Sequence, residues 1–186
     1  MPRPPRVEVP GGLFHVATRS SAKRVILGNE DDRGVLLELA KRTCRRQGWL
    51  CHGYCLLSTH YHLLVTTPKP NLAPGMQWLN GLYASTFNER HASHGHVFGA
   101  RYSSVLVQSD AHLLHLVAYL AMNPVRAGIC RDPGEWQWSS YRAMLGRVPA
   151  GFLRLNDVMR MFAFDPAEAR LRIEQYVFGD DVDMEV

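Results

Sequence analysis

The chain has 186 residues, of which 46% are hydrophobic and 20% are charged. This length supports one well-formed hydrophobic core and is short for two, so we expect one main domain with a small appendage. No apolar run approaches the roughly eighteen residues of a membrane-spanning helix, and the first residues lack the apolar core of a signal peptide. These features favour a cytoplasmic protein that has no membrane partner.

The net charge of +4 is distributed unevenly along the chain. Residues 1–147 carry 17 Lys and Arg against 9 Asp and Glu, whereas residues 148–186 carry 4 against 8. Most of the positive side chains are arginines, whose planar guanidinium groups pair well with phosphate. The charge pattern therefore favours nucleic acid as the partner, and a solvated basic surface is the alternative.

Hydrophobic periodicity and turn residues predict alternating strands and helices through most of the chain. The first helix has the clearest ends, because Asn29 can cap its N-terminus ahead of three acidic residues and Gly48 follows a basic cluster. Two glycines, at positions 75 and 81, weaken the second helix. The expected strands cover residues 13–17, 49–57, 60–67 and 102–108, and the expected helices cover residues 29–48, 72–90 and 110–122, the last capped by Asp110.

This order of elements, βαββαβ and then a further helix, is typical of the ferredoxin-like α+β fold. In that fold the first and third strands are the central neighbours of an antiparallel sheet, with helices on one face. After residue 147 we expect a small helical appendage, with short helices that start near Asn156 and Asp165. Beyond it, an acidic tail ends the chain.

Two histidines occupy the third expected strand. His60 and His62 are two residues apart, so in an extended strand both side chains point to one face, about 7 Å from each other. Together they can hold one metal ion on the open face of the sheet, and a purely structural role is the alternative. His15, in the neighbouring first strand, would be either a partner of this histidine pair or a packed strand histidine.

The last helix of the main domain carries the second candidate group of residues. Tyr119 and Asn123 are one turn apart, about 6 Å along the helix axis, on the same face as His112 and His115. Both could point at the same centre. The alternatives are that Tyr119 is a core residue and that Asn123, which precedes Pro124, ends the helix.

These motifs, in this order and spacing, resemble the single-tyrosine HUH transposases, and among them the REP-associated tyrosine transposases. The resemblance extends over nearly the whole chain. The matching segments are PGGLFHV at 10–16, YCLLSTHYHLLV at 54–65, NGLY at 80–83, FN at 87–88, GHVF at 95–98, RY at 101–102, YLAMNPVRAG at 119–128 and WSSY at 138–141.

The resemblance implies a catalytic domain at residues 1–147, followed by a helical extension at 148–186 with the acidic tail. It makes Tyr119 the nucleophile and His60, His62 and Asn123 the ligands of Mg²⁺ or Mn²⁺. A free tyrosine hydroxyl, with a pKa of about 10, is a poor nucleophile unless the phosphate is activated. The implied reaction is cleavage and transfer of single-stranded DNA at repeat hairpins (repetitive extragenic palindromes) through a 5′-phosphotyrosine. The residues expected to contact the DNA are Arg3, Arg6, Arg19, Arg101 and Arg126.

The chain departs from the pattern of this family in two turns. It has Ser58 and Thr59 where a Pro-Asn pair commonly precedes the histidines, and Gly99 and Ala100 where Gln-Gly commonly precedes Arg-Tyr. Neither difference removes a proposed catalytic group, but both affect the shape of a turn.

Two other functions remain open at this stage. One is a nucleic-acid-binding module without turnover, and the other is a metal-dependent phosphodiesterase that uses water and leaves Tyr119 structural. The residues also leave open whether the protein is a monomer or a homodimer, and whether Tyr119 acts on the histidine pair of its own chain. Trp136 and Trp138 could stack on unpaired bases or anchor their segment to the core.

Overall fold

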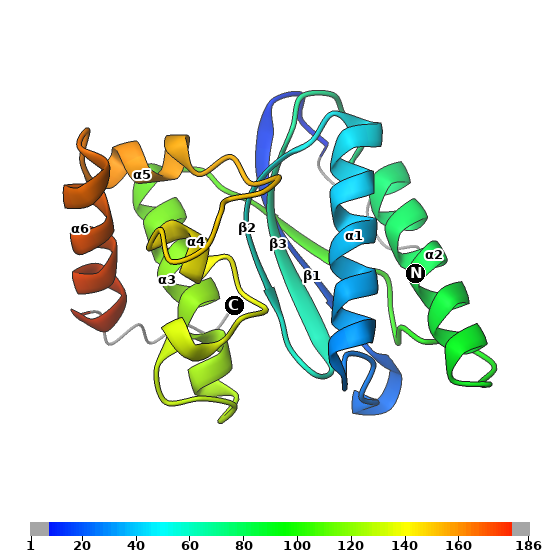
Figure 1. Ribbon diagram of the computed structural model, residues 1–186. Coiled ribbons are helices and arrows are strands. Elements are labelled where there is room, and N and C mark those ends of the chain that lie inside the picture. The colour runs from blue at the N-terminus through cyan, green and yellow to red at the C-terminus, as the bar shows by residue number, and fades with distance from the viewer. Residues whose placement is uncertain (1–7, 180–186) are drawn as a thin grey trace.

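The computed structural model describes residues 8–179 and contains one four-stranded antiparallel sheet (Figure 1). The order of the strands in the sheet is β2-β3-β1-β4, so β1 and β3 are the central neighbours, and the predicted ferredoxin-like arrangement is confirmed. The strands are β1 (Gly12–Arg19), β2 (Leu50–Leu56), β3 (His60–Thr67) and β4 (Ser103–Leu106), and the main helices are α1 (Glu30–Gln47), α2 (Leu72–Arg90) and α3 (Asp110–Arg126).

Local sequence signals set both ends of α1. The side chain of Asn29 accepts a hydrogen bond of 2.8 Å from the backbone N–H of Asp32, as a helix cap does. At the other end Gly48 adopts a left-handed conformation with φ of 72°, which suits glycine because it has no Cβ. Both predicted ends of this helix are therefore confirmed.

The helix α2 runs without interruption from Leu72 to Arg90, although two glycines lie inside it. A Cβ added at Gly75 would come within 2.1 Å of the ring of Trp49, so the absence of a side chain lets the helix lie directly on the indole. No atom lies within 4 Å of the corresponding position at Gly81. Gly75 thus serves close packing, and its predicted weakening effect does not break the helix.

The two faces of the sheet are covered by different helices. Figure 1 shows α1 and α2 on one side of the sheet and α3 on the other. Along β3, Tyr61 points to α2, where its hydroxyl donates a hydrogen bond of 2.5 Å to Asn80, whereas the next residue, His62, faces Tyr119 of α3. The expectation of helices on one face therefore holds for α1 and α2 but is wrong for α3.

The reason is the apolar side of α3, which must be buried. Leu116 and Leu120 are almost fully buried, and α3 packs on β2 at Gly53, where an added Cβ would lie 3.4 Å from the side chain of Leu120. The face that we expected to be open is therefore partly covered, and the histidine pair lies between the sheet and α3.

The ends of α3 and β4 also differ from the prediction. The cap of α3 is Ser109, whose side chain accepts the N–H of His112 at 3.1 Å, and not Asp110. The helix continues past Pro124 to Arg126, because the N–H of Ala127 still donates to the carbonyl of Asn123 at 2.9 Å. The strand β4 is shorter than expected, at Ser103–Leu106.

After α3 the chain returns to the sheet and then forms the expected helical appendage. The indole of Trp136 donates a hydrogen bond of 3.0 Å to the carbonyl of Leu56, which supports the anchoring alternative for this residue. The remaining elements are the short 3-10 helices η1 (Ser21–Lys23) and η2 (Pro133–Glu135), and the helices α4 (Tyr141–Met144), α5 (Asn156–Phe162) and α6 (Pro166–Gly179). Asp165 caps the last of these through the N–H of Glu168 at 2.8 Å.

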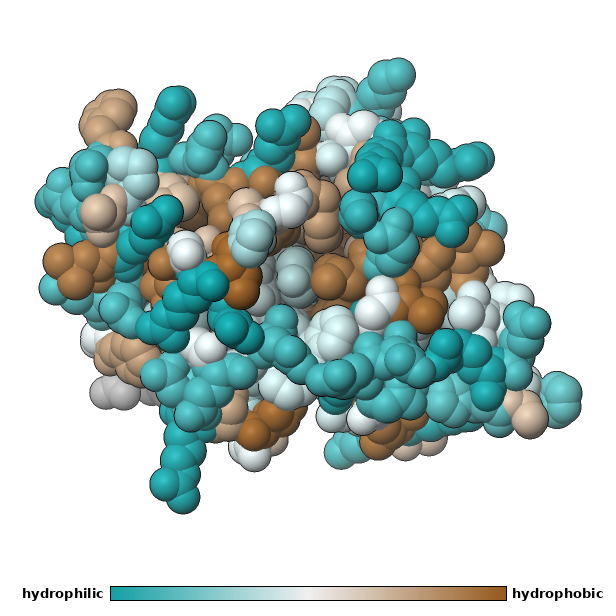
Figure 2. Space-filling model, in the orientation of Figure 1, coloured by the Kyte–Doolittle hydropathy of each residue, from teal (hydrophilic) through white to brown (hydrophobic). Residues whose placement is uncertain are grey.

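Hydrophilic side chains cover much of the surface seen in Figure 2, and hydrophobic residues reach the surface between α1 and the C-terminal helices. In this region Phe152 and Leu37 line a groove of about 430 Å³. Among residues 8–179, no helix has the length and apolar character needed to cross a membrane.

Candidate active site

The histidine pair lies where β3 begins. The ring centroids of His60 and His62 are 5.2 Å apart, and the ring planes are inclined by 77°. His62 is only 1% exposed, whereas His60 is half-buried. The alternation of side chains along the strand therefore brings both imidazoles to the same face, as the sequence predicts.

Each histidine of the pair has a partner at its Nδ1 atom. Nδ1 of His62 lies 3.0 Å from Nε2 of His15, and Nδ1 of His60 lies 3.0 Å from the hydroxyl oxygen of Thr59. Nε2 of His62 is buried and has no hydrogen-bond partner within the described chain. An unpaired buried nitrogen of this kind is costly, so it is a suitable ligand atom for a metal ion.

Burial keeps these imidazoles neutral. It lowers the pKa of His62, and it lowers the pKa of His15 and of His60 to about 4. Electrostatic interactions act in the same direction, with the guanidinium of Arg19 for His60 and with His112 for His15. Because a metal ion binds the neutral form of imidazole, these imidazoles could bind a metal ion at neutral pH.

Tyr119 faces His62 and His15 from α3. Its ring centroid lies 5.5 Å from that of His62 and 5.8 Å from that of His15, with the planes nearly perpendicular in both cases. Two turns further along the helix, the guanidinium of Arg126 lies 5.9 Å from the centre of the Tyr119 ring. The structure thus brings a tyrosine, two imidazoles and a positive charge into one place.

Asn123 is buried one turn after Tyr119. Its amide nitrogen donates a hydrogen bond of 2.9 Å to the backbone carbonyl of Tyr119. No hydrogen bond joins Asn123 to His60 or His62 in the described part of the chain. Nor, among those residues, do three His, Cys, Asp or Glu side chains form a group that could hold a metal ion. A third protein ligand would have to be of another type, such as an amide oxygen.

The predicted DNA-binding arginines lie in different places. Arg19 ends β1 opposite His60 in the strand register and is exposed, and Arg126 lies beside Tyr119. Arg101 lines a pocket next to α2. The prediction for Arg3 and Arg6 falls outside the described residues.

The sequence did not give a definite role to two residues near the site, His15 and Thr59. His15 contacts His62, which agrees with the alternative that His15 is a partner of the histidine pair, and the pairing of β1 with β3 expected from the fold class is the signal for this contact. Thr59 supplies its hydroxyl to His60 from one of the turns in which the chain departs from the family pattern.

Comparison with solved structures concerns the fold. The fold is shared with a solved REP-associated tyrosine transposase bound to a REP hairpin, with a TM-score of 0.68 and 16% identity over 83% of this chain and 90% of that one. A candidate transposase from Deinococcus radiodurans R1 is similar over 61% of this chain and 89% of its own, with 15% identity and a TM-score of 0.45. No curated protein matches the sequence.

The family follows from the sequence itself. The family described as "Transposase IS200 like" matches residues 9–123, which is more than half of the chain and includes the histidine pair, Tyr119 and Asn123. The chain therefore belongs to the IS200-like transposases and is a DNA-cleaving transposase.

Proposed function

We propose that this protein cleaves and rejoins single-stranded DNA through a covalent bond between Tyr119 and a 5′-phosphate. The observation that carries the proposal is the approach of the Tyr119 ring to His62, whose buried Nε2 has no hydrogen-bond partner in the described chain. A divalent ion, Mg²⁺ or Mn²⁺, would be held by His60, His62 and the amide oxygen of Asn123. Such an ion polarises the non-bridging oxygens of a phosphate and makes phosphorus more electrophilic.

In the proposed reaction the hydroxyl oxygen of Tyr119 attacks the phosphorus atom and loses its proton to solvent. The bond from phosphorus to the 3′-oxygen of the preceding nucleotide breaks, and that oxygen leaves as a 3′-hydroxyl. The phosphate becomes a 5′-phosphotyrosine and remains a diester. Because no diester is lost, a returning 3′-hydroxyl can attack the adduct and restore a DNA strand without nucleotide hydrolysis.

Other residues of the chain orient these groups. If Nε2 of His62 binds the metal, Nδ1 of His62 carries the proton and donates a hydrogen bond to Nε2 of His15. This hydrogen bond fixes the orientation of the His62 ring. Arg126 places positive charge beside Tyr119, where the phosphate must lie during attack. Arg19, opposite His60 in the register, would hold the DNA strand near the histidine pair.

We propose hairpins of repetitive extragenic palindromes as the DNA substrate, because a protein with this fold has been solved with such a hairpin. Tyr119 packs against His62 of its own chain, which favours a site that is complete within one chain. A non-catalytic binding module would not need a tyrosine ring packed against an imidazole whose second nitrogen is buried and unpaired.

The test is incubation of the protein with labelled single-stranded DNA from palindromic repeats that flank its gene, with Mg²⁺ or Mn²⁺, and then denaturing electrophoresis. We expect a protein–DNA adduct that requires metal and is absent in Tyr119→Phe. Tyr54→Phe is the matched control, because Tyr54 is a half-buried tyrosine of β2 that stacks on Phe152 away from the site. Cut DNA without an adduct would indicate water as the nucleophile, and tight binding without cutting would indicate a binding module.

A further inference from the structure

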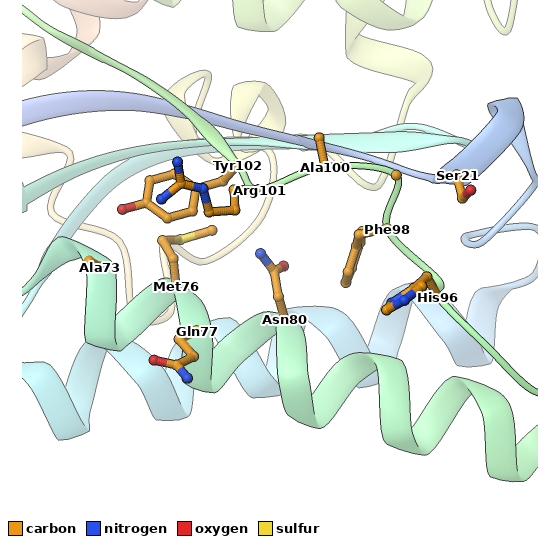
Figure 3. Close-up of a pocket in the computed structure, with 11 residues that line it drawn as sticks. Ser21, Ala73, Met76, Gln77, Asn80, His96, Phe98, Ala100, Arg101 and Tyr102 are labelled. Carbon is orange, nitrogen blue, oxygen red and sulfur yellow. The ribbon is translucent and has the colours of Figure 1, made fainter. Parts of the chain in front are cut away.

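A pocket of about 700 Å³ lies between α2 and the segment of residues 96–102 that leads into β4 (Figure 3). It is on the α2 side of the sheet, whereas the histidine pair faces α3. Asn80, Phe98, Arg101 and Tyr102 line it, and all four belong to the motifs singled out in the sequence. None of them except Arg101 has a role in the function described so far.

The apolar wall of the pocket is aromatic and fixed in place. Phe98 is half-buried, and its ring packs edge-on against Tyr61 at 6.4 Å and tilted against Tyr83 at 6.1 Å. Both of these tyrosines are buried in the core. Figure 3 shows the Phe98 ring beside the pocket, with Tyr102 and Met76 further along it. A rigid aromatic side chain at the wall of a pocket is a suitable surface for stacking a nucleobase.

The polar wall presents hydrogen-bond donors. The amide oxygen of Asn80 is held by the Tyr61 hydroxyl at 2.5 Å, which leaves the amide NH₂ group for another partner. Figure 3 shows Asn80 projecting from α2 into the pocket and the guanidinium of Arg101 on the opposite strand segment. Donors of this kind fit the carbonyl and ring-nitrogen acceptors of a base, and Arg101 also suits a phosphate.

The strand register connects this pocket to the active site. Ala17 of β1 pairs with His62 on one side and with Ser103 on the other, so the start of β4 lies two strand spacings, about 10 Å, from His62. At this end of the sheet Phe98 pairs with Ser20, and the N–H of Gly99 donates to the carbonyl of Arg19 at 3.3 Å. The pocket and the histidine pair lie on opposite faces of the sheet, so a strand that joins them passes around the edge strand β4. The path is therefore longer than about 10 Å and needs more than about three stacked nucleotides.

The segment lies close against the end of β1 because it contains a glycine. A Cβ added at Gly99 would lie 3.1 Å from the Cα of Ser21 and 3.2 Å from the carbonyl of Ser20. The position of Phe98 over the pocket therefore depends on Gly99, one of the residues at which the chain departs from the family pattern.

We propose that this pocket binds one unpaired nucleobase of the DNA strand a few nucleotides from the cleaved phosphate, stacked on Phe98 and hydrogen-bonded by the amide NH₂ of Asn80. Arg101 holds the adjoining phosphate. The pocket thereby positions the strand and selects for the base at that one place. This inference rests on the proposed function, because it assumes that a single strand of DNA reaches the histidine pair.

The test measures binding without metal, by fluorescence anisotropy, in a Tyr119→Phe background that cannot form the adduct. The probes are labelled strands in which one nucleotide at a time is replaced by an abasic nucleotide or by 2-aminopurine, whose fluorescence is quenched by stacking. We expect quenching at one position, and an abasic nucleotide at that position should weaken binding about tenfold.

Two variants link that position to the pocket. Asn80→Asp keeps the acceptor for Tyr61 but loses the NH₂ donor, and Phe98→Leu keeps an apolar side chain but loses the stacking surface. Each variant should bind the intact strand about tenfold more weakly than the parent protein does. For the strand that is abasic at the identified position, the affinities of the variant and the parent should be nearly equal. Ser85→Ala, at an exposed position of α2, is the control.

Equal losses on the intact and abasic strands, or no position with selective quenching, would overturn the proposed base pocket. Because these measurements need no cleavage, they separate the two proposals. If the pocket variants lose affinity only for the strand with the intact base, and the natural protein forms no adduct, the base pocket is supported and the proposed nuclease activity is rejected. If the natural protein forms the adduct but the pocket variants show no such selectivity, the nuclease activity is supported and the base pocket is rejected.

Discussion

Nε2 of His15 lies 3.0 Å from Nδ1 of His62, and both rings are buried between the sheet and α3. This contact occupies one nitrogen of His62 and leaves the other, Nε2, facing the site without a hydrogen-bond partner in the described chain. A ligand whose second nitrogen is held in this way has a fixed tautomer and orientation. The affinity for the proposed metal ion should therefore depend on His15, which is not one of the proposed ligands.

We predict that His15→Phe raises the Mn²⁺ concentration required for half-maximal adduct formation by about 10- to 100-fold, with activity recovered at high metal. The control is His52→Phe. His52 is likewise a buried strand histidine, but its ring bonds to the Arg154 carbonyl and the Thr66 hydroxyl, both at 2.9 Å. Both variants should lower stability. An unchanged metal requirement in His15→Phe would contradict the positioning role.

A second prediction concerns the stability of the metal-free protein in acid. Burial, and secondarily the charge of His112, lowers the pKa of His15 to about 4 from an unfolded value of 6.5. As the pH falls through 6.5 the unfolded chain gains a proton that the folded chain gains only near pH 4, so stability falls within this window. The loss attributable to His15 is at most about 3 kcal/mol.

Urea denaturation at pH 7 and pH 4.5, in the presence of a chelator, measures this loss. His15→Phe should be less sensitive to this change of pH than the natural chain, whereas the variant Ser85→Ala should behave like the natural chain. Equal pH dependence in all three proteins would show that His15 is not held neutral by the fold.

The third prediction concerns the arginine beside the nucleophile. Arg126→Gln removes the positive charge 5.9 Å from the Tyr119 ring and should slow adduct formation at saturating DNA about tenfold or more. Arg160→Gln, at an exposed position of α5, is the control for a general loss of charge. Single-turnover kinetics distinguish a role in the reaction from a role in DNA attraction. A residue that only attracts DNA would change the half-saturating DNA concentration and leave the maximal rate of adduct formation unchanged.

Features of the fold set by neighbouring residues could be predicted from the sequence. The ends of α1 follow from Asn29 and Gly48, and the common face of His60 and His62 follows from the two-residue period of a strand. Tyr119 and Asn123 were placed on one helix face by the same kind of reasoning. These predictions need only the geometry of one element.

Features that depend on how elements meet could not be predicted in the same way. The side of the sheet that α3 covers is decided by where its apolar stripe can be buried, and the contact of His15 with His62 needs the register of β1 against β3. The pocket joins Asn80 to Arg101 across a turn whose close approach depends on Gly99. No periodicity in the sequence reports such a contact.

A last prediction uses the two glycines of α2 as a matched pair. Alanine is favoured over glycine in a helix by about 1 kcal/mol, so Gly81→Ala, with no atom within 4 Å of the new methyl group, should stabilise the protein by up to that amount. Gly75→Ala has the same propensity gain but would place its Cβ 2.1 Å from the Trp49 ring, so we expect a net loss of about 1–3 kcal/mol. Urea denaturation of both variants measures the difference, and a stabilising Gly75→Ala would mean that α2 does not lie directly on the indole.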